Sequence, residues 1–231
     1  SVKGPNGIDV ASTADIAAAA QVRSLVDRTK WLGEMCCQAN GQENEAEHPL
    51  HLTVRKAHVL ADSLKVVTKL DRSELCRPWK FEIIDKDKTG GWKSVGTEDN
   101  WVQSLAEKMF HSSMGLWLPG AVGGSAMRIN PASDAIPGDH LLYFHFFGRI
   151  LGKALLEGQT IKQPLSQHLY KHILGWPITF GNTRKMSVEV RERLAEMIHG
   201  FFDVIPEPLL AVLDVEELEL LMHGRRDKAL L

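Results

Sequence analysis

Cysteine is scarce in this sequence: its 231 residues include only Cys36, Cys37 and Cys76. An odd number of cysteines, two of them adjacent, argues against the disulfide framework of small secreted proteins and favours a reducing compartment. The N-terminal residues contain no apolar signal segment, and the first residue is not methionine. We therefore expect an intracellular protein, cytoplasmic or nuclear, whose chain is an excised fragment or a processed product.

Positive charge is not in excess, and no long apolar run is present. The chain has 27 Lys and Arg against 29 Asp and Glu, for a formal net charge of −2. Nucleic-acid-binding modules normally carry a basic excess, so we expect no nucleic-acid partner. The most apolar stretch, residues 141–158, contains His145, Arg149 and Lys153. With 18 residues, several of them charged or ionisable, against the roughly 20 apolar residues of a membrane span, it predicts no membrane insertion.

The motifs of common enzyme classes are missing as well. The sequence has no Walker loop, no paired glycines of a dinucleotide fold and no His-Glu helix motif. His168 and His172 are four residues apart and could share a metal, but no third ligand is defined. Cys76 precedes Arg77, which would lower the pKa of its thiol, although a structural cysteine is the favoured interpretation. We assign no catalytic, cofactor-binding or metal-binding residue, and we expect no cofactor.

Residues 141–158, LLYFHFFGRILGKALLEG, predict a helix that is buried on most sides. His145, Arg149 and Lys153 recur every four residues and form one polar stripe. Gly148 and Gly152 lie on the adjacent stripe, where small residues permit close approach of another backbone. Asp139 is a suitable N-cap, and Gly158 follows the last turn, where a left-handed residue commonly ends a helix.

The remaining pattern is mostly helical. We expect residues 1–12 to be a flexible lead and residues 38–49, QANGQENEAEHP, to be an acidic linker or a surface loop within one domain. The predicted fold is α+β, mostly α, with a few short strands. Apolar spacing predicts helices at 13–37, 56–70, 100–110, 164–174, 187–202 and 214–224, and strands at 51–55 and 79–84.

The segment around the central helix has a recognisable order of motifs. Asn130-Pro131 is followed by residues 139–155, DHLLYFHFFGRILGKAL, and then by Gly158-Gln159. This order resembles the HECT-type ubiquitin ligase domain, whose pattern there is N-P, D-H-L-x-Y-F, F-x-G-R-x-L-G-x-A-L and G-Q. Residues 169–175 are similar to its F-Y-K-x-L-L-G segment, and residues 217–224 to its E-L-E-x-L-x-G segment. The resemblance covers residues 50–224 in order.

The resemblance implies a fold, a function and a set of partners. It implies the large subdomain of the HECT N-terminal lobe at residues 50–224, preceded by a helix and acidic linker at 1–49 and followed by a tail at 225–231. The family transfers ubiquitin from a conjugating enzyme, through a cysteine thioester, to substrate lysines, so ubiquitin and a conjugating enzyme are the implied partners. The residues that carry the family signature are Tyr143, Phe144, Gly148, Arg149, Gly152, Tyr170, Gly175, Pro206, Glu217 and Leu218.

The sequence also departs from the family pattern. The family has several dozen residues after L-L-G that form the subdomain docking the conjugating enzyme, whereas residues 176–186 here lead directly to the next helix. The catalytic cysteine of the family lies in an H-T-C-F-like motif of the C-terminal lobe, which none of the three cysteines matches. Residues 92–98 look like an insertion. We expect both the docking subdomain and the catalytic lobe to be absent from this chain.

Three hypotheses follow. The chain is a truncated or fragmentary HECT ligase, inactive alone. Alternatively, it is a non-catalytic remnant that binds ubiquitin or a regulator. The third hypothesis, an unrelated metal- or cysteine-dependent enzyme, rests only on His168, His172 and Cys76.

Overall fold

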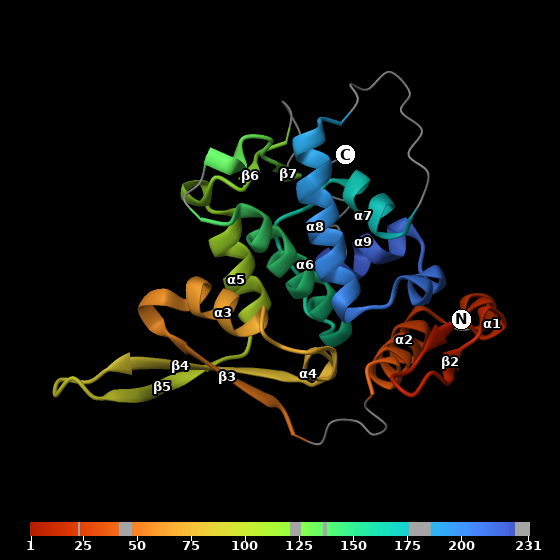
Figure 1. Ribbon diagram of the computed structural model, residues 1–231, viewed down its shortest axis with the longest axis horizontal. Helices are drawn as coiled ribbons and strands as arrows, with labels where there is room; N and C mark the ends of the chain where they lie inside the picture. The colour runs from red at the N-terminus through yellow and green to blue at the C-terminus, as the bar shows by residue number, and fades with distance from the viewer. Residues whose placement is uncertain (23, 42–47, 121–125, 136–137, 176–185, 225–231) are drawn as a thin grey trace.

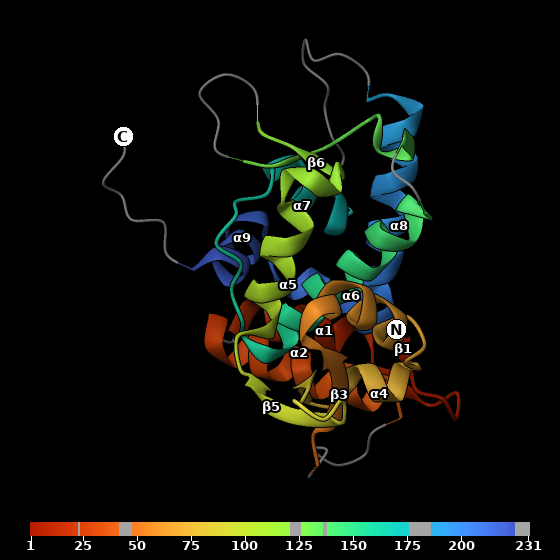
Figure 2. The ribbon, with the colours of Figure 1, turned by 90° about the vertical axis from the view of Figure 1, so that its left-hand side faces the viewer.

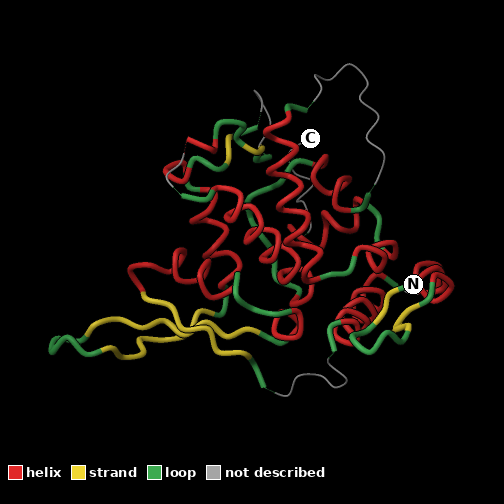
Figure 3. Tube along the Cα trace, in the orientation of Figure 1, coloured by secondary structure: helices red, strands yellow, loops and turns green. Residues whose placement is uncertain are grey.

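The computed structural model describes residues 1–22, 24–41, 48–120, 126–135, 138–175 and 186–224. Helices prevail in the described part, and the strands form small sheets (Figure 3). The predicted class, α+β and mostly α, is confirmed. None of the described helices combines the length and the hydrophobicity that crossing a bilayer requires.

Two long helices, α6 (His140–Glu157) and α8 (Val188–Val204), lie side by side at the centre (Figures 1 and 2). The two predicted cap residues of α6 are confirmed, because the Asp139 side chain accepts from the amide of Leu142 and Gly158 adopts a φ of 64°. At the start of α8, the Ser187 side chain accepts from the amide of Val190. Both ends of α6 are therefore determined by local chemistry that the sequence displays.

A three-stranded sheet lies below these helices in Figure 1 and extends away from them as a long hairpin. Strand β3 (Leu50–Arg55) is parallel to β4 (Trp79–Lys86), which is antiparallel to β5 (Trp92–Glu98). The segment interpreted as an insertion thus forms a strand. Nearly all of its side chains are exposed, so its sequence lacks the alternating burial that would have predicted it.

The chain between β3 and α6 packs against one side of the central helices. Residues 56–70, predicted as one helix, divide into a 3₁₀ turn and a shorter α-helix, and α4 was not predicted. The elements are η1 (Lys56–His58), α3 (Val59–Val67), α4 (Arg72–Cys76), α5 (Trp101–Phe110), η2 (Ser112–Met114), β6 (Trp117–Leu118), β7 (Arg128–Ile129) and η3 (Ser133–Ala135).

The C-terminal elements are α7 (Gln167–Ile173), η4 (Glu207–Val212) and α9 (Val215–His223). The prediction that α7 begins at Pro164 is wrong by about a turn. The carbonyl of Pro164 accepts from the amide of Met127, and Leu165 forms a parallel bridge with Met127. This pairing holds the segment extended until Ser166.

The N-terminal elements form what we call the N-terminal unit: β1 (Val2–Lys3), β2 (Asp9–Ala11), α1 (Thr13–Val22) and α2 (Leu25–Ala39). Two predictions fail here. Residues 1–12 contain an antiparallel strand pair instead of a wholly flexible lead. The single helix expected at 13–37 is two helices, because Ser24 is an N-cap whose side chain accepts from the amide of Asp27.

The core joins the sheet to the helices through aromatic rings. Trp79 and Phe81 of β4 each lie with ring centroids 5.2 Å from Trp101 of α5. Trp117 contacts both Phe144 and Phe147 of α6, at 5.6 and 5.2 Å. Burial of these rings is the main favourable term that holds the sheet and α5 against the central pair.

Candidate functional site

The contact between α6 and α8 is closest at Gly148 and Gly200. A Cβ atom on Gly148 would lie 1.9 Å from the carbonyl oxygen of Met197, and one on Gly200 would lie 1.9 Å from the carbonyl oxygen of His145. Each glycine therefore faces the backbone of the opposite helix, and no larger residue fits at either place. The close approach predicted at Gly148 is confirmed, and Gly200 is its counterpart.

Gly152 continues this contact one turn further along α6. A Cβ atom there would lie 2.9 Å from the Cβ of Val204 and 3.1 Å from the carbonyl oxygen of Phe201. Gly148 and Gly152, four residues apart on α6, form the small-residue stripe predicted from the sequence.

Arg149 ties three elements together. Its Nε donates to Oδ2 of Asp203 over 2.9 Å, and its Nη1 donates to the carbonyl oxygens of Val67 and Leu70 over 2.8 and 3.1 Å. The guanidinium thus satisfies carbonyls at the end of α3 while it pairs with α8. Breaking such a largely buried pair leaves an uncompensated charge and unpaired acceptors.

His145 lies on the same stripe and contacts two carboxylates of α8. Its Nε2 is 2.9 Å from Oδ2 of Asp203, and its Nδ1 is 3.4 Å from Oε2 of Glu196. The hydrogen bond with Asp203 raises the pKa of His145, although burial acts in the opposite direction. Burial acts to raise the pKa of Asp203, but hydrogen bonds with His145 and Arg149 outweigh it and lower that pKa.

Lys153 completes the stripe and is 1% exposed. Its Nζ donates to the carbonyl oxygen of Arg77 over 2.6 Å, pairs with Glu157 at 2.9 Å and lies 5.2 Å from the ring centroid of Trp79. Glu157 in turn accepts from the backbone amide of Trp79 over 3.0 Å. The predicted polar stripe therefore anchors the sheet and the preceding turn to α6.

Most of the other residues predicted to carry the family signature are buried, form hydrogen bonds or end helices. Tyr170 is buried and its hydroxyl contacts Nε2 of His223. Gly175 has a φ of 65°, just after α7. Glu217 forms the capping box of α9 with Asp214. The rest of the signature set comprises Phe144 and Leu218, both fully buried, Pro206, which precedes η4, and Tyr143, which lines a surface groove described below.

Two arginine contacts were not anticipated from the sequence. Arg28 of α2 forms a bidentate ion pair with Glu217 and donates to the carbonyl oxygen of Val212 over 2.7 Å. Arg193 of α8 is 1% exposed, and its Nε donates to the hydroxyl of Ser133. Each arginine is far in sequence from its partners, so no local pattern could have identified either contact.

The three cysteines form a cluster where α2 meets α4. The Cys76 thiol donates to the carbonyl oxygen of Cys36 over 3.5 Å and accepts from Nδ2 of Asn40 over 3.0 Å. Hydrogen bonding to the Cys37 thiol and then burial raise the pKa of Cys76. The expectation that Arg77 lowers this pKa is wrong, since its guanidinium instead donates to the carbonyl oxygen of His48.

His168 and His172 do not gain a third metal ligand in the described part of the chain. No three His, Cys, Asp or Glu side chains among the described residues are grouped so that they could hold a metal ion. Burial and the neighbouring His168 lower the pKa of His172, which keeps this imidazole neutral.

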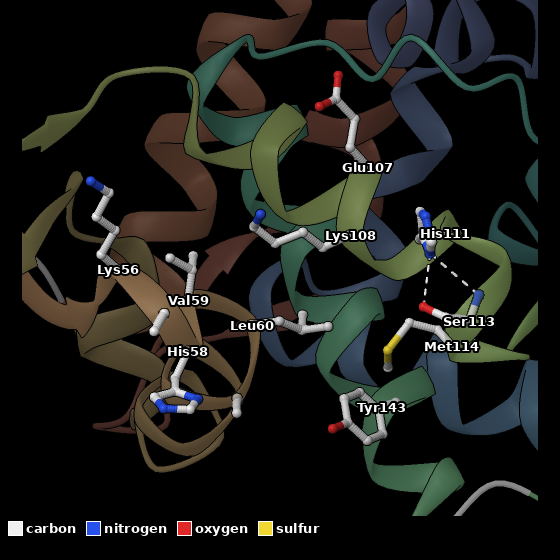
Figure 4. Close-up of a pocket in the computed structure, with 12 residues that line it drawn as sticks. Lys56, His58, Val59, Leu60, Glu107, Lys108, His111, Ser113, Met114 and Tyr143 are labelled. Carbon is white, nitrogen blue, oxygen red and sulfur yellow. Dashed lines mark hydrogen bonds between the residues drawn. The ribbon is translucent and has the colours of Figure 1, made fainter.

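A surface groove of about 570 Å³ lies between η1 and α3 on one side and α5 and η2 on the other (Figure 4). Its apolar lining includes Leu60, Met114 and Tyr143, all half-buried. The predicted signature residue Tyr143 thus joins α6 to this groove.

Basic side chains border the same groove. Lys56 and Lys108 extend from its two sides in Figure 4, and the Glu107 carboxylate points away from them. An apolar floor with a charged rim is typical of a site that binds another protein. His111 also lines the groove, where its Nδ1 lies 2.7 Å from the hydroxyl of Ser113 and caps η2 by accepting from the Ser113 amide over 3.3 Å (Figure 4).

Comparison with known proteins assigns the family. Residues 103–197 match the family model described as the HECT-domain (ubiquitin-transferase). The E3 ubiquitin-protein ligase ptr1 of Schizosaccharomyces pombe is 32% identical over 169 residues, which cover 72% of this chain. The E3 ubiquitin-protein ligase NEDD4 of Homo sapiens is 24% identical over 250 aligned positions, which cover 80% of this chain.

The chain spans 5% of the length of ptr1 and 19% of the length of NEDD4. The match with the family model includes all of α6 and reaches into α8, where the glycine contact and the polar stripe lie. The family match and the similarity to these ligases together show that this chain belongs to the HECT-domain family.

Proposed function

We propose that the chain forms the large subdomain of the N-terminal lobe of a HECT-type ubiquitin ligase. In this role it is a scaffold for a reaction that passes ubiquitin from a conjugating enzyme to a ligase cysteine as a thioester and then to a substrate lysine. We propose further that this segment alone forms no such thioester. Its place of action, by this proposal, is the cytoplasm or the nucleus.

The observation that carries the scaffold proposal is that residues of the predicted signature pack the central helices together. Gly148 and Gly152 permit close packing, and Arg149 binds α3 and α8 to α6. A thioester nucleophile needs an accessible, ionisable thiol. Cys36 and Cys76 are buried with raised pKa values, Cys37 is half-buried, and no cysteine of this chain lies in an H-T-C-F motif.

The alignment with NEDD4 supports the proposed lack of a docking subdomain. It extends over 250 positions and thus exceeds the 231 residues of the chain, although it covers only 80% of them. That relative therefore has many positions with no counterpart here. The short connection at residues 176–185, where the family subdomain is expected, lies outside the described residues.

The test is a ubiquitin thioester assay with activating enzyme, a panel of conjugating enzymes and tagged ubiquitin, read on non-reducing gels. We expect no adduct of this chain that a thiol reductant removes. A fusion that restores the docking subdomain and C-terminal lobe of a HECT relative should form one. A reductant-sensitive adduct on the unmodified chain, lost on substitution of one of its cysteines, would refute the proposed inactivity.

The groove of Figure 4 favours a second candidate function, in which the chain is a non-catalytic module that binds ubiquitin or a regulator. Leu60, Met114 and Tyr143 provide an apolar centre, and Lys56 and Lys108 provide a polar rim, which is the usual arrangement of a protein-binding surface.

Titration of the isotope-labelled chain with ubiquitin, followed by NMR, tests this candidate. We expect shifts confined to the groove and at least about a tenfold weaker binding after Leu60→Asp, since burying a charge there is unfavourable. Val26→Asp is the matched control, because Val26 is 76% exposed on α2, away from the groove. Ubiquitin-induced shifts outside the groove, or equal weakening by both substitutions, would reject it.

A further inference from the structure

The cysteine cluster is not used by the proposed scaffold role. Cys37 belongs to the last turn of α2, and Cys76 is the last residue of α4. The Cys37 thiol donates to the carbonyl oxygen of Cys76 over 4.0 Å, and it is near enough to the Cys76 thiol to raise the pKa of that thiol. The thiol of Cys37 thus adjoins Cys76, although the two residues are far apart in the sequence.

The three thiols differ in their access to solvent. Cys36 is fully buried, Cys76 is 7% exposed and Cys37 is half-buried. Solvent-borne reagents therefore reach Cys37 first. Burial raises the pKa of Cys36, so this neighbour stays a neutral thiol. Cys36 also presents its carbonyl oxygen to the Cys76 thiol, at 3.5 Å.

The surroundings favour a fixed position for Cys76. Nδ2 of Asn40 donates both to its sulfur, over 3.0 Å, and to the carbonyl oxygen of Cys36, over 2.9 Å. A disulfide sulfur can still accept the bond from Asn40. Oxidation at this site would therefore keep the bond from Asn40 and remove only the two bonds that the thiols donate to the carbonyl oxygens of Cys36 and Cys76.

We propose that Cys37 and Cys76 are a redox-sensitive pair that closes to a disulfide and ties the N-terminal unit to α4. With oxidised glutathione, the Cys37 thiolate attacks one glutathione sulfur and expels the other as a thiolate. Cys76 then loses its proton to solvent, and its sulfur attacks the Cys37 sulfur, which expels the second glutathione. Two protein thiols lose two electrons and two protons, and one glutathione disulfide becomes two thiols.

The Cys37–Cys76 disulfide would form at one end of α2, and the existing contact of α2 with α9 lies near its other end. Arg28 binds Glu217 at the start of α9, while Cys37 lies at the other end of α2. A disulfide would close a loop from residue 37 to residue 76 and reduce the entropy of the unfolded chain. Under reducing conditions both thiols stay reduced, and the non-covalent contacts alone hold the unit.

The experiment is disulfide mapping of the whole chain after incubation with oxidised glutathione, alkylation and tryptic digestion without reductant. We expect residues 31–55 linked to residues 73–80. Because the first peptide contains both Cys36 and Cys37, variants must assign the bond. Cys36→Ala should retain the link, Cys37→Ser should lose it, and Cys76→Ser should leave a stable glutathione adduct on Cys37.

The melting temperature provides a second readout. We expect the oxidised chain to melt about 5–10 °C above the reduced chain, with no such rise in Cys37→Ser. Circular dichroism shows beforehand that each variant is folded. A Cys36–Cys37 bond, a glutathione adduct that persists on Cys37 of the unsubstituted chain, a link between two molecules or an unchanged melting temperature would each overturn the proposal.

Discussion

The α6–α8 pair and the β4–β5 hairpin differ in how closely they pack against the rest of the molecule. In the helix pair, Gly148 and Gly200 bring two backbones into contact, and Arg149 satisfies carbonyls of a third element. In the hairpin, the side chains of β5 are almost all exposed, and the strand is held mainly by its backbone pairing with β4. The hairpin also extends away from the body (Figure 1).

This difference shows where the family signature has its effect. Gly148, Gly152 and Arg149, which are predicted to carry the family signature, lie where the structure leaves no room for added volume or for loss of the charge. The side chains of β5 are almost all exposed, so substitutions there meet few neighbouring atoms. Substitutions should therefore differ greatly in cost between the two regions.

The largest effect is expected for Gly148→Ala and Gly200→Ala. In each variant the new methyl group would overlap a carbonyl oxygen of the opposite helix, so the helices must separate. We expect a loss of more than about 3 kcal/mol in the free energy of unfolding, measured by urea denaturation, or failure to fold.

Gly33→Ala is the matched control for these substitutions. Gly33 lies within α2, and a Cβ atom there meets nothing within 4 Å. Alanine should stabilise this helix by up to about 1 kcal/mol. An equal loss at Gly33 and Gly148 would contradict the close-contact account of the helix pair.

The next largest effect is expected for Arg149→Met. The substitution removes the guanidinium that binds Asp203 and two backbone carbonyl oxygens. The pair is largely buried, because the Arg149 side chain is 13% exposed and the Asp203 side chain is 24% exposed. We expect a loss of about 3–5 kcal/mol in urea unfolding.

Arg55→Met provides the comparison in the sheet. Arg55 pairs with Asp62 and lowers the pKa of that carboxyl to about 2, but the Arg55 side chain is 45% exposed. Screening by water weakens such a pair. A loss at Arg55 equal to that at Arg149 would contradict the claim that burial makes the Arg149 pair the more costly one to break.

A smaller, pH-dependent effect is expected for His145→Gln. The pKa of His145 is raised in the folded state, chiefly by Asp203. Such a group contributes stability that is fully present below its unfolded pKa of about 6.5 and is lost as the pH rises through its folded pKa. The stability difference between the unsubstituted chain and the variant should therefore be larger at about pH 5.5 than at about pH 8.5. A difference that grows with pH would show that the sign is wrong.

The smallest effect is expected for Val95→Thr in β5. Val95 is 46% exposed and lies at the irregularity in the pairing of β5 with β4. We expect a change within about 0.5 kcal/mol in the free energy of unfolding. A loss comparable with that at Gly148 would mean that the hairpin packs against something as closely as the central helices do.

Elements with local signals were predictable from the sequence. The cap residues Asp139 and Gly158 and the capping box of Asp214 gave helix ends that agree with the structure. The spacing of Gly148 and Gly152 indicated a close contact because glycine within a buried helix has little other use. The partner helix and Gly200 were not identified, since the pairing depends on distant parts of the chain.

The failures have the same cause. Strand β5 is held by backbone pairing, which its exposed side chains do not encode. Helix α7 starts late because Leu165 is held by Met127. The thiol cluster and the Arg28–Glu217 pair join residues that are remote in sequence. Periodicity within a segment carries no information about such contacts.

Native-state hydrogen exchange tests most directly whether the signature residues form the frame of the molecule. We expect amides in the middle of α6 and α8 to exchange only through global unfolding, with the free energy measured by urea denaturation, and amides of β5 to exchange through local opening at a much lower free energy. Protection of β5 equal to that of α6, or local opening of α6 around Gly148 and Arg149, would contradict this account.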